Sequence, residues 1–140
     1  MVNVDDFTTV VEKFAGIFIR LPSVEKLSFT TLSVLHTLVH QGPLRLSELT
    51  ATEQVSQPAI TQLVARLERD GLVDRRPDPR DGRAVLARAT DAGTRIVRTR
   101  HRDRVAQLDH LFGQLTPEER DAVGAALPAL LRMVALHDAP

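Results

Sequence analysis

The sequence predicts a mainly α-helical chain that carries one small β-hairpin. Apolar residues recur at helical spacing along most of its 140 residues, and Ser, Thr, Pro and Gly stand where such segments begin and end. Two short, partly apolar segments flank a turn-rich hexad at 77–82. With 43% hydrophobic and 26% charged residues, the chain has an ordinary folded composition and is long enough to bury a core.

The first helix is predicted over residues 5–20. Asp5 and Asp6 suit its first turn, where acidic side chains interact favourably with the helix dipole, and Pro22 is expected to stop it. The apolar residues at helical spacing are Phe7, Val10, Val11, Phe14, Ile17, Phe18 and Leu21.

The second and third helices are predicted over residues 28–41 and 46–53. Ser28 is the expected N-cap of the second helix, because its hydroxyl oxygen can accept a hydrogen bond from a free backbone N–H. Gly42, followed by proline, should end that helix. Its inward-facing side chains are expected to be Leu32, Leu35, Leu38 and Val39.

The fourth helix is predicted to follow a tight connection at Gln54-Val55. Ser56 can cap it, and Pro58 lies in its first turn, where a missing N–H carries no penalty. Gly71 is expected to end it. The predicted buried stripe comprises Ala59, Ile60, Leu63, Val64 and Leu67.

Residues 72–76 and 84–89 are predicted to be the two strands of a hairpin. The segment between them, 77–82, is rich in proline, aspartate and glycine. Because this loop is long for a hairpin, its tip is expected to be mobile and exposed.

Two long helices are predicted to complete the chain. Thr90 is the expected cap of a helix over about 91–113. The tetrapeptide 116–119 (TPEE) predicts another helix start, with threonine as the cap and proline in the first helical position. Pro128 should remove one hydrogen bond from this last helix and bend its axis. Its apolar face comprises Val123, Leu127, Leu130, Leu131 and Val134.

The formal net charge is zero, but the basic residues are concentrated in the middle of the chain. Residues 75–104 hold ten arginines and four acidic residues, whereas residues 105–140 hold two basic and five acidic residues. A basic centre between acidic ends indicates a surface that faces a polyanion. Charge alone is equally compatible with solvated arginines on a helix surface.

The order of elements (helix, helix, short helix, tight turn, helix, hairpin) is that of a winged helix-turn-helix. The matching residues are 56–71 (SQPAITQLVARLERDG), Leu72-Val73, Arg75-Arg76, 78–83 (DPRDGR) and 90–93 (TDAG). In this order they resemble the MarR family of bacterial transcriptional regulators. The resemblance covers roughly residues 28–95 in sequence detail and nearly the whole chain in helix order.

The resemblance implies a homodimer that binds double-stranded DNA at a pseudo-palindromic operator, most often as a repressor. Residues 1–27 and 91–140 would form a helical dimerisation region, and residues 28–90 would form the winged helix-turn-helix DNA-binding domain. The second helix of the helix-turn-helix would enter the major groove, and the wing would touch the adjacent minor groove. A small ligand, often aromatic and anionic, would bind between the two parts and shift operator affinity.

The residues expected to contact DNA lie on the outer face of the fourth helix and on the hairpin. Glutamine can bond adenine, and threonine can touch a thymine methyl group or a phosphate. The segment 56–70 holds two arginines and two acidic residues, so phosphate neutralisation is expected from the wing, where Arg80 or Arg83 would enter the minor groove. Arg75, Arg76 and Arg88 would lie along the wing strands. The predicted DNA-binding set is Ser56, Gln57, Pro58, Thr61, Gln62, Arg66, Arg75, Arg76, Arg80 and Arg83.

Asp78 and Asp81 are expected to orient the wing by pairing with wing or helix arginines. Two residues depart from the family pattern. Arg45 stands where relatives usually cap the short helix with threonine. Gln54 stands where a glycine commonly makes the turn with positive φ, and a non-glycine there costs on the order of 1 kcal/mol.

A ligand pocket, if built from aromatic groups, would use Phe14, Phe18 and Phe29, with His36 beside them. His36 and His40 lie four residues apart on one predicted helix, which is also a spacing for zinc. Zinc needs further ligands that spacing does not supply, so no metal site is assigned and a zinc-responsive regulator is kept as an alternative.

Several function classes are excluded by composition. The chain has no cysteine, which excludes disulfides, thiolate metal sites and thiol-based sensing. No Ser-His-Asp or paired-carboxylate arrangement is recognisable, so we expect neither an enzyme nor a cofactor. No apolar segment approaches the roughly eighteen residues of a membrane span and no secretory signal is recognisable, so a cytoplasmic location without a membrane partner is expected. The main competing function is a protein–protein adaptor that uses a winged helix without a specific DNA site.

Overall fold

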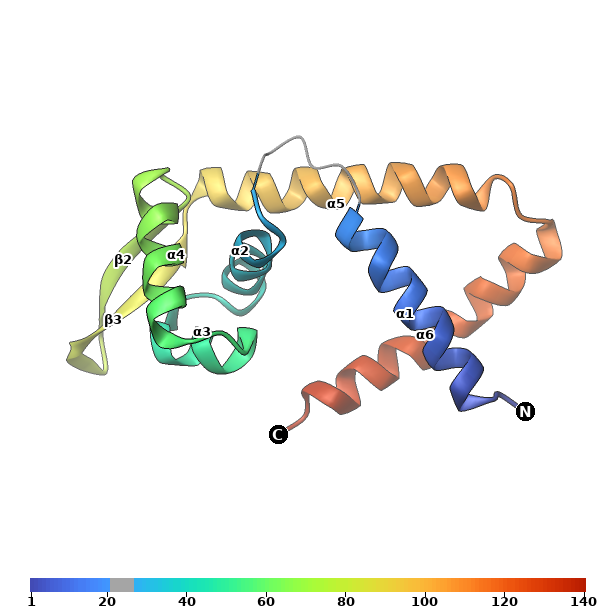
Figure 1. The fold of residues 1–140 in the computed structure, drawn as a ribbon, viewed down its shortest axis with the longest axis horizontal. Coiled ribbons are helices and arrows are strands. Elements are labelled where there is room, and N and C mark those ends of the chain that lie inside the picture. Colours follow the sequence, from blue (N-terminus) through green and yellow to red (C-terminus); the bar gives the residue numbers. More distant parts are fainter. Residues whose placement is uncertain (21–26) are drawn as a thin grey trace. The chain divides into compact units, whose positions relative to one another are not determined.

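A computed structural model describes residues 1–20 and 27–140 (Figure 1). The expected stop at Pro22, and Leu21 of the first apolar face, lie outside the described residues. Two compact units are present, Met1–Arg104 and Val105–Pro140. Within the described residues, no helix is long and apolar enough to cross a membrane.

The six predicted helices are confirmed, close to the predicted ends. The first unit contains α1 (Val4–Arg20), α2 (Phe29–Gln41), β1 (Leu44–Arg45), α3 (Leu46–Glu53), α4 (Gln57–Arg69), β2 (Val73–Asp78), β3 (Asp81–Ala89) and most of α5 (Asp91–Phe112). The second unit contains the end of α5 and α6 (Pro117–Asp138), and α6 continues through Pro128.

Helix starts are fixed by the predicted caps. The Ser28 hydroxyl accepts a hydrogen bond from the Thr31 N–H at 3.2 Å, and the Ser56 hydroxyl accepts one from the Ala59 N–H at 3.3 Å. At α6, Thr116 and Glu119 form a reciprocal capping box. Each cap satisfies a backbone donor that the helix itself leaves free.

Positive φ angles mark the turns, as predicted. Gly42 (φ 82°) ends α2, and Gly71 (φ 74°) follows α4. The Leu72 N–H then donates to the Leu67 carbonyl at 2.9 Å, which closes α4 with a Schellman-type bond. Gln54 is the one non-glycine with positive φ among the described residues, at 54°, so it takes the left-handed turn between α3 and α4.

The three strands form an antiparallel sheet in the order β1-β3-β2. The predicted six-residue loop is wrong at both ends, because β2 reaches Asp78 and β3 starts at Asp81, so that only Pro79 and Arg80 connect them. Regular pairing runs to Pro77 opposite Val85, and the register then shifts so that Asp78 faces Asp81. Proline and aspartate favour loops in the sequence, but here the carboxylate of Asp78 finds partners within the hairpin and beside it.

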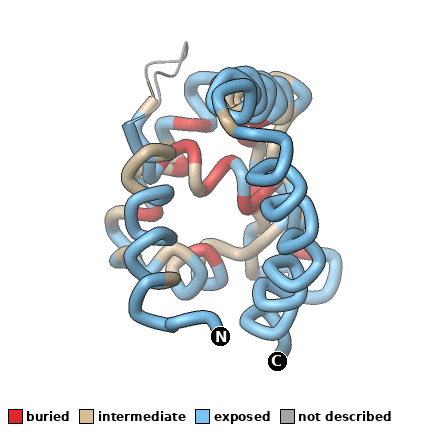
Figure 2. Tube along the Cα trace, turned by 90° about the vertical axis from the view of Figure 1, so that its right-hand side faces the viewer, coloured by how far each residue is buried: buried red, intermediate tan, exposed pale blue. Residues whose placement is uncertain are grey.

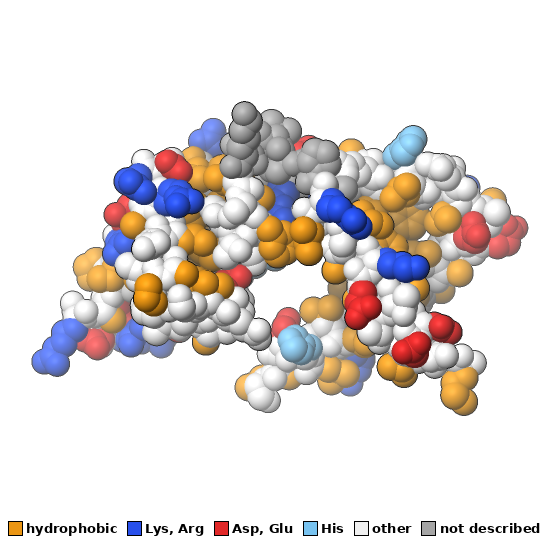
Figure 3. All heavy atoms as spheres, viewed as in Figure 1, with side chains coloured by type: hydrophobic (Ala, Val, Ile, Leu, Met, Phe, Trp, Pro, Cys, Tyr) orange, Lys and Arg blue, Asp and Glu red, His pale blue; other side chains and the backbone are white. Residues whose placement is uncertain are grey.

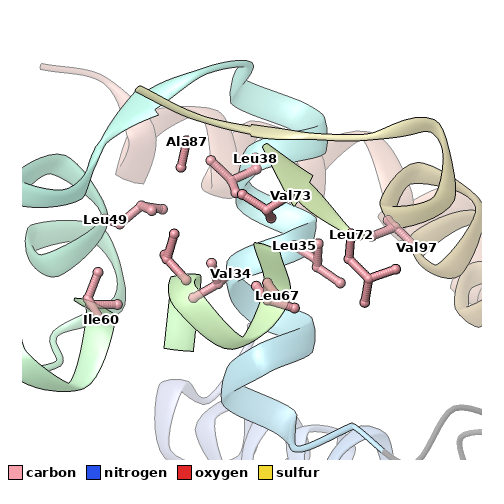
Figure 4. Close-up of a cluster of buried hydrophobic side chains, with 11 residues drawn as sticks. Val34, Leu35, Leu38, Leu49, Ile60, Leu67, Leu72, Val73, Ala87 and Val97 are labelled. Carbon is pink, nitrogen blue, oxygen red and sulfur yellow. The ribbon is translucent and has the colours of Figure 1, made fainter. Parts of the chain in front are cut away.

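The hydrophobic core lies between α2, α3, α4, the sheet and the start of α5 (Figure 4). Figure 2 shows the buried positions gathered there. The predicted core residues Leu35, Ile60 and Leu67 are fully buried. The helix positions of the buried cluster that the prediction missed are Val34, Leu49 and Val97. The buried cluster is Val34, Leu35, Leu38, Leu49, Ile60, Val64, Leu67, Leu72, Val73, Ala87 and Val97.

The glycine of the TDAG motif, Gly93, is required by close packing. A Cβ atom at this position would lie 2.3 Å from the Leu72 carbonyl oxygen, so only glycine lets α5 approach this closely. Thr90 also connects the start of α5 to the residues that follow α4. Its hydroxyl donates to the Gly71 carbonyl at 2.7 Å and accepts from the Gly93 N–H at 3.2 Å. The motif thus fixes the start of α5 against the end of α4.

The terminal helices α1 and α6 have no buried residue. The predicted apolar face of α6 is present, but Leu127, Leu131 and Val134 are 51%, 69% and 58% exposed. On α1, Val10, Val11 and Phe14 are about half exposed. Hydrophobic side chains are accordingly visible on the surface of these helices (Figure 3).

Candidate nucleic-acid interface

The outer face of α4 is polar and open to solvent. Its inner face is held by Ile60, Val64 and Leu67, all fully buried, so the opposite side of the helix must face outward. All six predicted contact residues on this helix and its cap are exposed: Ser56, Gln57, Pro58, Thr61, Gln62 and Arg66.

Two contacts orient the start of this face. The Gln57 side-chain amide lies 3.0 Å from the Thr50 hydroxyl on α3, which bridges the two helices of the helix-turn-helix. The Thr61 hydroxyl donates to the Gln57 carbonyl one turn earlier, at 2.9 Å. Ser56 is occupied as the N-cap through its oxygen but stays exposed. The face can therefore present amide and hydroxyl groups to base edges or phosphates.

The tip of the β2–β3 hairpin carries exposed arginines (Figure 3). Arg80 and Arg83 lie in the turn and at the start of β3, and both are exposed. Within the described ranges, neither guanidinium makes an ion pair. Both are free to meet an external anion.

The other wing arginines are engaged within the chain. Arg88 forms a two-bond pair with Asp74, at 3.1 and 2.6 Å, and that pair holds the pKa of Asp74 below its usual range. Arg75 reaches Glu68 on α4 at 3.1 Å, so this pair links the hairpin to the helix. Arg76 lies 3.9 Å from the same Asp74. These partners compete with any phosphate for the three side chains.

Asp78 is the buried acid of the hairpin, with 6% of its surface exposed. One carboxylate oxygen accepts a hydrogen bond from the Arg80 N–H at 2.9 Å. The other lies 2.8 Å from the Arg45 Nε and 2.6 Å from a terminal nitrogen of the same guanidinium. The Arg80 N–H, and then Arg45, hold the pKa of this carboxyl below its usual range. Asp81 has fewer partners: among residues 1–20 and 27–140, its carboxylate accepts a single hydrogen bond, from the Arg83 N–H at 3.0 Å.

Sequence reasoning missed the role of Arg45. It was expected only as a departure from a capping threonine, and it does occupy the N-cap position of α3. Its side chain instead reaches an acid 33 residues later in the chain. The signal for this pair in the sequence is an arginine at a cap position together with a hairpin aspartate that is expected to pair with an arginine.

A separate cavity of about 440 Å³ lies between α2 and α5 within the first unit. Of the residues predicted for a ligand pocket, His36 belongs to the wall of this cavity, whereas Phe14 does not. Phe18 and Phe29 lie beside it, with the guanidinium carbons of Arg104 and Arg100 5.0 and 5.6 Å from their ring centres. The wall comprises His36, Val39, His40, Val97, Arg98, Arg100, His101, Arg102 and Arg104.

The cavity is strongly cationic. Burial, followed by His40, Arg100 and Arg104, lowers the pKa of His36, and Glu53 opposes this shift. Burial also lowers the pKa of Arg104, whose buried Nε finds no hydrogen-bond partner in the described part of the chain. The rings of His36 and His40 are 4.2 Å apart, but residues 1–20 and 27–140 offer no group of three or more potential metal ligands.

Comparison with known proteins identifies the family. Residues 27–85 match the model of the MarR family. Over 115 residues the chain is 35% identical to an uncharacterized HTH-type transcriptional regulator, Mb0904 of Mycobacterium bovis, and this alignment covers 82% of the chain and 80% of the relative. The family and this relative are transcriptional regulators rather than enzymes.

Solved structures share the fold. RV1404 from Mycobacterium tuberculosis superposes with a TM-score of 0.81 at 25% identity, covering 96% of each chain. A mutant of Staphylococcus aureus MepR bound to an oligodeoxyribonucleotide superposes with a TM-score of 0.68 at 20% identity, covering 96% of this chain and 99% of MepR. The wing, the helix-turn-helix and these matches together establish that the chain belongs to the MarR family of DNA-binding, winged helix-turn-helix transcriptional regulators.

Proposed function

We propose that the chain is a homodimeric repressor that binds a pseudo-palindromic operator. In this proposal residues 28–90 are the DNA-binding domain, with α4 in the major groove and the wing in the adjacent minor groove. Residues 1–27 and 91–140 are the dimerisation region. A structural relative, the MepR mutant, is bound to an oligodeoxyribonucleotide, which supports DNA as the partner.

The observation that carries this proposal is the distribution of free and paired charge around α4. The helix offers a polar face, and the hairpin tip offers Arg80 and Arg83 unpaired within the described ranges. Internal carboxylates neutralise Arg45, Arg75 and Arg88. The proposed division of labour is therefore base and phosphate contact by α4, and minor-groove contact by Arg80 and Arg83.

The exposed apolar faces of α1 and α6 support the homodimer. Helices with such faces are stable in water when another surface covers them, and a contiguous apolar patch marks an interaction site. A second copy of the chain supplies matching faces by symmetry. Two copies would present their α4 helices to major grooves about 34 Å apart.

The cationic cavity supports regulation by a small anion. Arg100, Arg104, His36 and His40 line a space large enough for an aromatic acid, and Phe18 and Phe29 lie beside the arginines. An anion bound here would offset the repulsion among the cationic groups. It would change operator affinity if the DNA-binding arrangement of the dimer binds it more weakly or more strongly than other arrangements.

The test is selection of bound sequences from a random duplex pool, with and without aromatic carboxylic acids. A recovered inverted repeat supports the operator, and the absence of any consensus favours the protein–protein adaptor instead. On the recovered site, replacing Arg80 and Arg83 together with alanine should weaken binding at least about tenfold and flatten its dependence on salt. Unchanged affinity across the salt series would contradict the role of the wing.

A further inference from the structure

The tip of the wing is not held by strand pairing alone. The β2–β3 register is regular up to Pro77 and shifts between Pro77 and Asp78. Regular strand pairing therefore does not extend to the turn at Pro79 and Arg80. A two-stranded ribbon is by itself only marginally stable in water. The direction in which Arg80 points must therefore depend on contacts other than the β2–β3 ladder.

Asp78 supplies those contacts. It is the last residue of β2, and it is more buried than any other acid of the hairpin. One of its oxygens holds the Arg80 N–H, and the other holds the guanidinium of Arg45 through two nitrogens. A single carboxylate thus joins the backbone at the wing tip to the start of α3.

Arg45 connects this carboxylate to the helix-turn-helix. It is paired with Leu86 through β1 and β3, and it immediately precedes α3. Helix α3 continues to the left-handed turn at Gln54 and then to α4, and the Thr50–Gln57 contact bridges the two helices. Because Arg45 is a poor N-cap residue, its place is better explained by this contact than by stabilisation of the helix start.

We propose that Arg45 is a positioning residue that sets the wing tip relative to α4, acting through Asp78 on Arg80. The proposal rests on the proposed DNA-binding mode and adds a specificity element that this chain carries in its own sequence. Arg45 itself does not contact DNA in this scheme. Its role is to make the major-groove and minor-groove contacts of one protomer a single rigid unit.

The competing role is direct phosphate contact by Arg45, whose side chain is 39% exposed. The two roles differ in their coupling to Arg80. A direct phosphate contact acts independently of the wing tip, so its loss adds to the loss of Arg80. A positioning residue acts only through the wing tip, so its loss removes what Arg80 contributes and the two effects do not add.

The experiment is a double-mutant cycle on an operator recovered by pool selection. The variants are Arg45→Thr, Arg80→Ala and the double variant, and affinity is measured by fluorescence anisotropy across salt concentrations. Threonine is a good N-cap, so α3 should be retained. Each single variant is expected to bind about tenfold more weakly, and the double variant no more weakly than Arg80→Ala alone. Hydroxyl-radical footprints of Arg45→Thr should lose the protection at the minor groove, whereas methylation of guanine N7 by dimethyl sulfate should show that the major groove is still protected.

Two controls complete the design. Arg88→Thr breaks an equivalent arginine–aspartate pair at the base of the hairpin, and its effect should add to that of Arg80→Ala. Arg45→Lys keeps the charge but cannot bring two nitrogens to one oxygen, so it should restore only part of the affinity. Additive losses for Arg45→Thr and Arg80→Ala, or an intact minor-groove footprint, would overturn the proposal. Failure to recover any operator would instead count against the proposed function, so the two failures are distinguishable.

Discussion

Apolar side chains are buried in the winged helix-turn-helix, whereas those of the terminal helices α1 and α6 are at least partly exposed to solvent. On α4, Ile60, Val64 and Leu67 are completely buried within the chain, whereas on α6 no residue is buried. Both helices have an apolar face in the sequence. The difference is that α4 packs against α3 and β2, while in its own unit α6 finds no surface that buries it.

The winged helix-turn-helix thus buries its own core within one chain, whereas α1 and α6 bury no residue. The core between α2, α3, α4 and the sheet accounts for the shape of the candidate interface without any partner. In the proposed homodimer, a second copy of the chain covers the exposed faces of α1 and α6. Mutations in the winged core should therefore change the stability of the chain, and mutations on the exposed faces of α1 and α6 should change its assembly.

The largest effect is expected from Leu131→Asp on the exposed face of α6. A charge there should prevent burial against a second chain, leave the winged core folded and abolish the dimer. Operator affinity should then fall by about a hundredfold or more, because two half-sites are no longer bound together. Light scattering after gel filtration reports the mass, with Leu131→Met as the matched control. An intact dimer of the Leu131→Asp variant would contradict the proposed role of this α6 face in dimerisation.

The next effect is expected from Leu35→Ala in the core, where the side chain is fully buried. Loss of its buried methyl groups should lower the free energy of unfolding by about 2–5 kcal/mol. Urea denaturation followed by circular dichroism measures this change. A loss of less than about 1 kcal/mol would contradict a closely packed core.

Gly93→Ala should destabilise the junction between α4 and α5. Its new Cβ would meet the Leu72 carbonyl oxygen, so backbone has to move, at a cost of about 1–3 kcal/mol. Gly124→Ala is the matched control on α6, because open space surrounds that position, and it should be neutral or stabilising by up to about 1 kcal/mol. Equal effects of the two changes on thermal unfolding would count against the close approach.

The smallest effect concerns pH and His36. Because its pKa is lowered in the folded chain, the unfolded chain takes up a proton first as the pH falls below about 6.5. Stability should therefore decrease from about pH 7.5 to pH 5.5, and His36→Gln should weaken that dependence. An anion bound in the cavity should raise the pKa of His36 again, so its binding should tighten as the pH falls. Denaturation and ligand titration at several pH values test both signs.

Local signals in the sequence were sufficient for the helices. Ser28, Ser56 and Thr116 cap where predicted, because a cap depends only on a few adjacent residues. The left-handed turn at Gln54 is expected from the resemblance to the MarR family, in which a glycine commonly takes positive φ at this place. The outward face of α4 followed from the period of its buried stripe.

Contacts between residues that lie far apart in the chain could not be predicted from local sequence signals. The strand β1 is two residues long and exists through pairing with β3, so nothing local marks it. The hexad was expected to be a loop, since proline and aspartate are common in loops, and the partners that fix Asp78 include an arginine 33 residues earlier. The expectation that Asp78 pairs with a wing or helix arginine agrees with its ion pair to Arg45 at the start of α3, but it did not name that partner.

By itself, the sequence determined the helices, their ends, the polar face of α4 and the family to which the chain belongs. These properties follow from short-range periodicity, capping and an ordered motif. Only the tertiary structure decided which arginines are neutralised, which face solvent and which acid supports the wing tip. The physical reason is that an ion pair depends on distances between side chains, and those are set by packing elements that lie far apart in the chain.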